Sequence, residues 1–219
     1  IERGYISVNT SANAELAPDV AEISIAVKTY DNKSMQKATL QNKEISEQVI
    51  ATLKSMIDTS KGDYIKTADF SATPIYSYSG NKRNFDKYQV SNSVVVHTKS
   101  IDKIGTMIDK SIALGATDVN SLNFSVSNYE AQCNDLLTLA AKKASARANA
   151  VAKTVPTTLS GIRSMDVSCS TSNSSRPQYK MLMANRAMMM DSEAAGSSTT
   201  IESGVIKVFA NVSATYFVK

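Results

Sequence analysis

The chain has 219 residues, of which 42% are hydrophobic and 20% charged, and its 24 basic and 20 acidic residues give a formal charge of +4. This composition is typical of a folded globular protein and excludes a disordered one. The charges form no like-signed run that could follow a phosphate backbone, so we expect no nucleic-acid partner. No window approaches the roughly 18 consecutive apolar residues that a membrane-spanning helix needs, so we expect no transmembrane segment.

The first half of the chain alternates between strand and helix patterns. Residues 20–29 alternate apolar and polar side chains, which predicts a half-buried strand. From Ser34 to about Met56 the apolar spacing is that of an amphipathic helix. Strand character returns in residues 64–74 and 85–99, with turn-like residues between them, so we predict a long hairpin. The helix positions predicted to face the core are Ala38, Ile45, Val49, Leu53 and Ile57.

A short helix and a strand are predicted next. Ser100 is suited to cap the helix at its start, and Gly115 is suited to end it in a left-handed conformation. A strand near residues 119–127 follows. The helix positions predicted to face inward are Ile101, Ile104, Ile108 and Ile112.

The last part of the chain is predicted to hold one long helix and two strands. Asn128 can cap a helix over residues 129–155, which Pro156 ends. Strands are predicted at residues 161–170 and 204–219, and the strict alternation of the second predicts a central strand. The long helix carries a ridge of small residues beside larger apolar ones: Ala140, Ala144, Ala148 and Ala152, with Leu136, Leu137 and Val151.

These elements predict an α+β fold in which one short and two long helices cover a mixed, largely antiparallel twisted sheet. Residues 20–70 and 88–124 both follow the order strand, helix, strand, which indicates two pseudo-repeated units. We expect a single domain over residues 1–219 that could divide into two lobes. Within it, residues 171–200 lose periodicity and are rich in Ser and Met, so we predict a mobile loop there.

Six segments form a set, in order, along nearly the whole chain. They lie at residues 17–23, 65–76, 88–96, 114–119 and 201–204 and in the Ala-rich helix at 140–152. The set resembles the SIMPL-domain family, which includes YggE-like oxidative-stress defence proteins and periplasmic immunogenic proteins. This chain departs from that family in a start with fewer glycines, and in Thr157-Thr158 after the long helix, where a Gly is common.

The resemblance implies a periplasmic or secreted envelope antigen with an α+β fold, a tendency to form homo-oligomers and a link to oxidative stress. The family has no established catalytic residues that could be assigned to positions of this chain. The chain begins at Ile1 without a Met or a signal peptide, so we expect a mature form whose signal was removed.

No catalytic constellation is evident in the sequence. His97 is the one imidazole, and it is predicted to lie on the surface of a strand, on the face opposite Val94 and Val96. Asp19, Asp63 and Asp69 lie near strand ends, where they could pair as acid and base but are predicted to be solvated loop acids. The eight glycines are scattered and form no phosphate-binding loop. We therefore expect no enzyme, no cofactor and no metal site built from His, Cys and acids.

Two cysteines leave two alternatives open. Cys133 and Cys169 could form a disulfide that closes a loop of about 36 residues, if the compartment is oxidising. They could equally be two partly buried thiols. The sequence does not decide between them.

Two surfaces could bind a partner. Tyr76, Tyr78 and Tyr88 flank the predicted hairpin, where they would either present their rings to a partner or pack across the strands. The second surface is the loop around Arg186. Its methionines are Met181, Met183, Met188, Met189 and Met190. They could bind Cu(I), consume oxidant by forming sulfoxides, or pack as an adaptable surface on a neighbouring subunit.

The sequence thus predicts a non-catalytic homo-oligomeric binding or assembly module, with self and an envelope protein as partners and with Tyr76, Tyr78 and Arg186 as interaction residues. The alternative is an envelope protein that binds Cu(I) or scavenges oxidant through the methionines named above.

Overall fold

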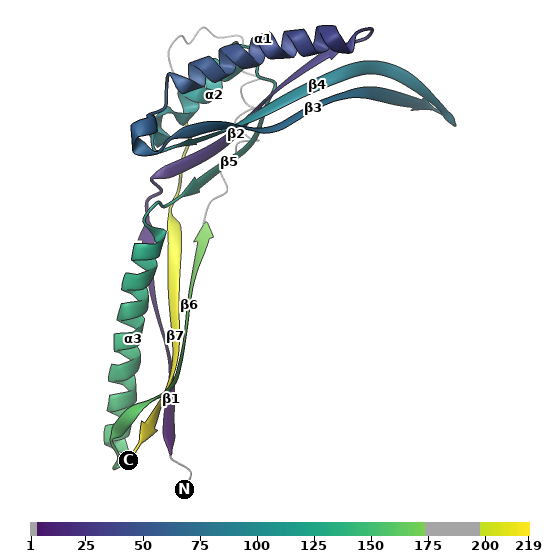
Figure 1. The fold of residues 1–219 in the computed structure, drawn as a ribbon. Helices are drawn as coiled ribbons and strands as arrows, with labels where there is room; N and C mark the ends of the chain where they lie inside the picture. Colours follow the sequence, from purple (N-terminus) through teal and green to yellow (C-terminus); the bar gives the residue numbers. More distant parts are fainter. Residues whose placement is uncertain (1–3, 174–197) are drawn as a thin grey trace. The chain divides into compact units, whose positions relative to one another are not determined.

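The computed structural model describes residues 4–173 and 198–219, and its helices and strands are shown in Figure 1. The described residues fall into two compact units. The first comprises residues 4–18, 126–173 and 204–219, and the second comprises residues 19–125 and 198–203. The predicted α+β class is confirmed, with two long helices and one short one. The predicted loop over 171–200 lies outside the described residues, except for its two ends.

The first unit is a three-stranded antiparallel sheet with one helix along it (Figure 1). The strand order is β1 (Tyr5–Leu16), β7 (Ile206–Val218), β6 (Leu159–Asn173), so the last strand is central, as predicted. The helix, α3 (Tyr129–Thr154), covers one face. β1 is a strand that the patterns above do not predict.

The Ala ridge of α3 is buried against this sheet. Ala140, Ala144 and Ala148 are fully buried against alternate residues of β7, because side chains of one carbon let the helix backbone lie close to the strands. Thr10 of β1 donates a hydrogen bond of 2.7 Å to the carbonyl of Ala140, which satisfies a buried hydroxyl. Val151, one of the larger apolar residues named beside the ridge, is 44% exposed.

Cys133 of α3 and Cys169 of β6 are joined in a disulfide. The sequence left open a disulfide or two thiols, and the structure has the disulfide. The bond ties the helix to an outer strand of the sheet, 36 residues away in the chain.

The second unit holds a four-stranded antiparallel sheet in the order β3-β4-β2-β5. Its elements are β2 (Val20–Asp31), α1 (Met35–Lys54), the 3-10 turn η1 (Thr59–Lys61), β3 (Tyr64–Ser79), β4 (Lys82–Thr98), the 3-10 turn η2 (Ile101–Lys103), α2 (Ile104–Ala113) and β5 (Asp118–Ser125). They repeat strand, helix, strand twice, as predicted. We predicted one sheet, but the structure has two. The prediction was wrong because alternation in one strand does not specify which strand pairs with it.

Both helices of the second unit cover the same face of its sheet (Figure 1). Ile23, Ile25 and Val96 from the strands meet Leu53 of α1 and Ile108 of α2 in a core from which water is excluded. Burial of each such side chain stabilises the fold by roughly 1.5–3 kcal/mol.

Two inward positions differ from the prediction. Ile112 is 37% exposed, and its place in the core is taken by Met107, which is fully buried. In α1 the buried face includes Asn42, whose side-chain amide donates to the carbonyls of Val27 and Val90 at 2.8 and 3.1 Å. A polar side chain with two strand carbonyls as partners can be buried at little cost.

The predicted helix ends are partly confirmed. The Ser34 hydroxyl accepts a hydrogen bond from the backbone N–H of Lys37, which caps α1. Gly115 follows α2 with φ of 109°, a conformation that favours glycine. Ser100 and Asn128 occupy cap positions, but neither side chain makes a capping hydrogen bond.

Candidate interaction surface

The hairpin of β3 and β4 places most of its aromatic side chains on one face. Tyr76 is paired with Phe85, Tyr78 with Arg83, and Pro74 with Tyr88. The register shifts between Ile75 and Tyr76, which leaves Asp86 without a paired residue. This β-bulge brings Phe85 and Tyr88, three residues apart, to the same side of the ribbon, where regular alternation would have separated them.

These side chains contact one another across the two strands. The Phe85 ring lies 6.1 Å from that of Tyr76, edge to face, and 4.8 Å from that of Tyr88. The Arg83 guanidinium carbon lies 3.6 Å from the centre of the Tyr76 ring, a cation–π contact. The contacts hold the rings in fixed positions, so a partner would not have to order them.

Much of this aromatic face is exposed. The exposed fraction is 71% for Tyr78, 56% for Phe70, 44% for Phe85 and 37% for Tyr76. Phe70 belongs to the same face, since it alternates in step with Tyr76 along β3. We call Phe70, Tyr76, Tyr78, Arg83, Phe85 and Tyr88 the aromatic hairpin surface.

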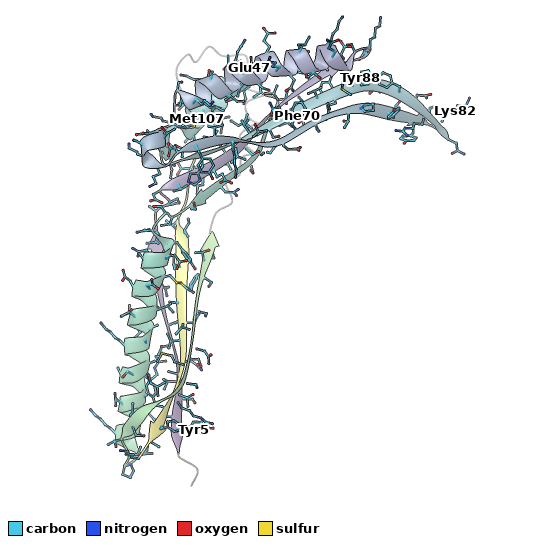
Figure 2. All side chains as sticks on the ribbon, in the orientation of Figure 1. Tyr5, Glu47, Phe70, Lys82, Tyr88 and Met107 are labelled. Atoms are coloured by element: carbon cyan, nitrogen blue, oxygen red, sulfur yellow. A yellow bond between two sulfur atoms is a disulfide. The ribbon has the colours of Figure 1, made fainter. Side chains whose placement is uncertain are left out.

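Helix α1 covers the base of the hairpin and not its tip (Figure 2). Asn42 of α1 reaches the backbone of Val90, and from Val90 toward Lys82 the residues of β4 change from buried to exposed. Three cations and one acid, namely Lys82, Arg83, Lys87 and Asp86, lie near the tip. The surface therefore combines exposed rings with a positive rim.

The structure places the predicted interaction residues as follows. Tyr76 packs across the strands and stays partly exposed, whereas Tyr78 is the more exposed ring. Phe70 and Phe85 were not predicted. Phe70 alternates in step with Tyr76 along β3, which was a usable signal, whereas Phe85 reaches this face only through the bulge at Asp86. Arg186 and the five methionines of the predicted Met-rich loop lie outside the described residues.

His97 lies on the face of its sheet that no described helix covers. Its Nδ1 is 3.7 Å from a carboxylate oxygen of Glu22, and its ring stacks on Tyr64 with the centres 4.7 Å apart. The side chain is 29% exposed. His97 is thus a residue of the strand surface opposite Val94 and Val96, as predicted.

Asp63 differs from its prediction as a solvated loop acid, because it is 3% exposed. Its carboxylate accepts hydrogen bonds from the Thr98 hydroxyl at 2.7 Å and from the backbone N–H groups of Asp58 and Lys99 at 3.0 and 2.8 Å. Burial raises the pKa of Asp63, but the three hydrogen bonds outweigh burial and hold that pKa below its usual value. Asp63 therefore joins the start of η1 to the end of β4, while Asp69 is exposed on β3.

In the part of the chain that the structure describes, no three His, Cys, Asp or Glu side chains gather closely enough to hold a metal ion. No described helix is both long enough and apolar enough to cross a lipid bilayer.

Comparisons with known proteins find a matching family model and similar bacterial proteins. A sequence model of the SIMPL family, described as a protein of unknown function (DUF541), matches residues 6–216. The chain is similar to the 26 kDa periplasmic immunogenic protein of Brucella melitensis, with 27% identity over 155 residues, which cover 68% of this chain and 59% of that protein. It is also similar to the uncharacterized protein YggE of Escherichia coli K12, with 23% identity over 129 residues, 58% of this chain and 50% of that protein. The matches thus span between half and three-fifths of these relatives.

Proposed function

The chain belongs to the SIMPL family, and from this premise we propose that it is a non-catalytic periplasmic protein acting as a homo-oligomeric binding or assembly module. The periplasmic location is supported by the name of the Brucella relatives. The partners proposed are further copies of this chain and, beyond them, another envelope protein.

The aromatic hairpin surface is the observation that carries this proposal. Soluble monomers seldom leave several aromatic rings exposed side by side, and such patches mark interaction sites. Tyr and Phe dominate the energetics of protein interfaces because each buries a large area. The rings of Tyr76, Phe85 and Tyr88 are already fixed by contact with one another, which lowers the entropy lost on binding.

Unpaired strand edges give the assembly a second means of contact. β3 and β5 are the outer strands of one sheet, and β6 is an outer strand of the other; on its remaining outer strand, β1, two carbonyls are occupied by Lys143 and Arg147. Outer strands carry backbone groups that can pair with another chain. β3 combines an outer edge with Phe70, Tyr76 and Tyr78, so one partner could use both features.

Size-exclusion chromatography with light scattering tests the proposal. We expect the unaltered protein to be an oligomer and the double variant Tyr78→Thr/Phe85→Thr to dissociate at a concentration at least about 10-fold higher, since hot-spot aromatics contribute most of an interface's energy. Thr keeps the strand propensity of both positions. The matched control is Leu40→Gln, which removes a 59% exposed apolar side chain from α1 of the same unit.

Two outcomes would count against this function. A strictly monomeric protein at the highest concentration reached would remove the assembly part. Equal dissociation of the hairpin variant and the Leu40→Gln control would remove the hairpin as the interface. The link to oxidative-stress defence is part of the same proposal, and peroxide survival of cells lacking the protein would test it.

A further inference from the structure

The first unit leaves one face of its sheet uncovered by any described residue. α3 packs against one side, where Val208, Ala210 and Val212 of β7 are buried. On the other side Asn211 and Ser213 are exposed, although β7 is the central strand. Among the described residues, the middle of this central strand therefore carries exposed polar side chains where an unoccupied packing surface would be apolar.

The strand register arranges six polar side chains of this face in two rows. One row runs Asn9, Ser213, Asp166 and the next runs Ser11, Asn211, Ser168 across β1, β7 and β6. With strands about 4.8 Å apart and alternate residues about 7 Å apart, the six cover roughly 10 by 7 Å. They line a shallow hollow of about 630 Å³.

Two cations from α3 form the rim of this hollow. The Lys143 ammonium donates to the carbonyl of Ser11 at 3.2 Å, and the Arg147 guanidinium donates to the carbonyl of Asn9. Both cations are anchored on the outer edge of β1, where they occupy carbonyls that an added strand would need. The rim thus disfavours a peptide strand at β1 and offers the remaining N–H groups to a ligand.

The hydrogen-bonding capacity of the hollow selects the ligand. Asn and Ser side chains both donate and accept, Asp166 accepts only, and Lys143 and Arg147 donate only. A hydroxyl group also both donates and accepts, so a ligand dense in hydroxyls matches this set. Asp166 offsets one of the two rim cations, so the lining has too little net charge to hold a polyanion, and the lack of apolar side chains among the six opposes a lipid tail.

We propose that this hollow is a binding site for a neutral oligosaccharide. Phe209 lies on the same face just outside the residues that line the hollow, two residues from Asn211 along β7, and is 36% exposed. Its ring offers an apolar plane to the C–H face of a sugar ring, while the amides and hydroxyls reach the sugar's hydroxyls. The inference does not depend on the aromatic hairpin surface, which belongs to the other unit.

Calorimetric titration of the intact chain tests the site. The probes are three neutral hexasaccharides, namely β-1,4-linked N-acetylglucosamine hexamer, cellohexaose and maltohexaose, with a sulfated heparin hexasaccharide as the charged comparison. We expect saturable binding of at least one neutral probe, with little dependence on salt because no charge on the ligand is screened. Asn211→Val/Ser213→Val should weaken that binding at least about 10-fold by removing direct hydrogen bonds.

The matched control is Ser172→Val, which changes a hydroxyl on the same face of β6 but outside the hollow. It should bind like the unaltered protein. Both variants introduce β-branched side chains, which favour strands, at exposed strand positions, and their unfolding midpoints show whether the fold is retained. The site is refuted if no neutral probe saturates by about 5 mM, if the two variants bind alike, or if the heparin probe binds tighter.

Discussion

Replacement of Asp63 by Asn should destabilise the second unit by about 2–3 kcal/mol, although the two side chains have nearly the same shape. The Asp63 carboxylate accepts from the Thr98 hydroxyl and the Asp58 amide on one oxygen, and from the Lys99 amide on the other. Hydrogen bonds to a charged acceptor contribute about 1.5–3 kcal/mol each. Asn has only one accepting oxygen, so its NH2 group must face one of the donors that now bind Asp63. Two donors that face each other make no hydrogen bond.

The loss should depend on pH in a defined direction. The pKa of Asp63 is lowered from 3.8 in the folded protein, so the unfolded chain binds a proton at a higher pH than the folded one. The stabilisation is therefore complete above pH 3.8 and is lost as the pH falls through the folded pKa. The difference in stability between the unaltered protein and Asp63→Asn should shrink over this acidic range.

Urea unfolding followed by circular dichroism, at neutral pH and at several acidic values, measures both effects. The control is Asp69→Asn, an exposed acid on a strand of the same sheet, which should change stability by less than about 0.5 kcal/mol. The reasoning fails if Asp63→Asn costs no more than the control, or if its cost is the same at acidic and neutral pH.

Three further changes have expected effects on unfolding free energy or protein yield. Cys133→Ser should cost about 4 kcal/mol by opening the 36-residue loop, and reductant should have the same effect on the unaltered protein; equal urea midpoints would contradict this. Gly105→Ala should destabilise the protein despite the better helix propensity of Ala, because its Cβ would clash with the backbone carbonyl oxygen of Thr199; a raised melting temperature would refute the contact. Ala144→Leu should cost about 1–3 kcal/mol or prevent folding by pushing α3 off its sheet, which thermal melts and soluble yield would show.

Local patterns predicted the second unit well. The hairpin, the two helices and the stop at Gly115 each depend on residues within one segment, and such signals are readable from one stretch of sequence. The same is true of the alternation in β7, which correctly predicted a central strand.

Other features depend on residues far apart in the chain and were therefore not predictable. β1 was missed because Thr10 and Ala12 stand on its inward face, and their burial is evident only beside α3. Asn42 is polar in the middle of a helical stripe, and its partners lie on two strands. Of the exposed rings of the hairpin, those of Tyr76 and Tyr78 were predicted and that of Phe85 was not. The bulge at Asp86 is needed to bring Phe85 to the side of Tyr76.

The pairing of β1 with β7 joins Tyr5 to Phe217, and it sets the order in which the protein can fold. Residues 19–125 supply all four strands of the second sheet in one continuous stretch, so that sheet can form while synthesis is still under way. β1, made before any of them, must wait with its apolar side unpaired until the last strand arrives. Contacts of such high sequence separation form slowly and leave strands open to aggregation in the meantime, so we expect a chaperone to stay bound to β1 longer than to any strand of the second sheet.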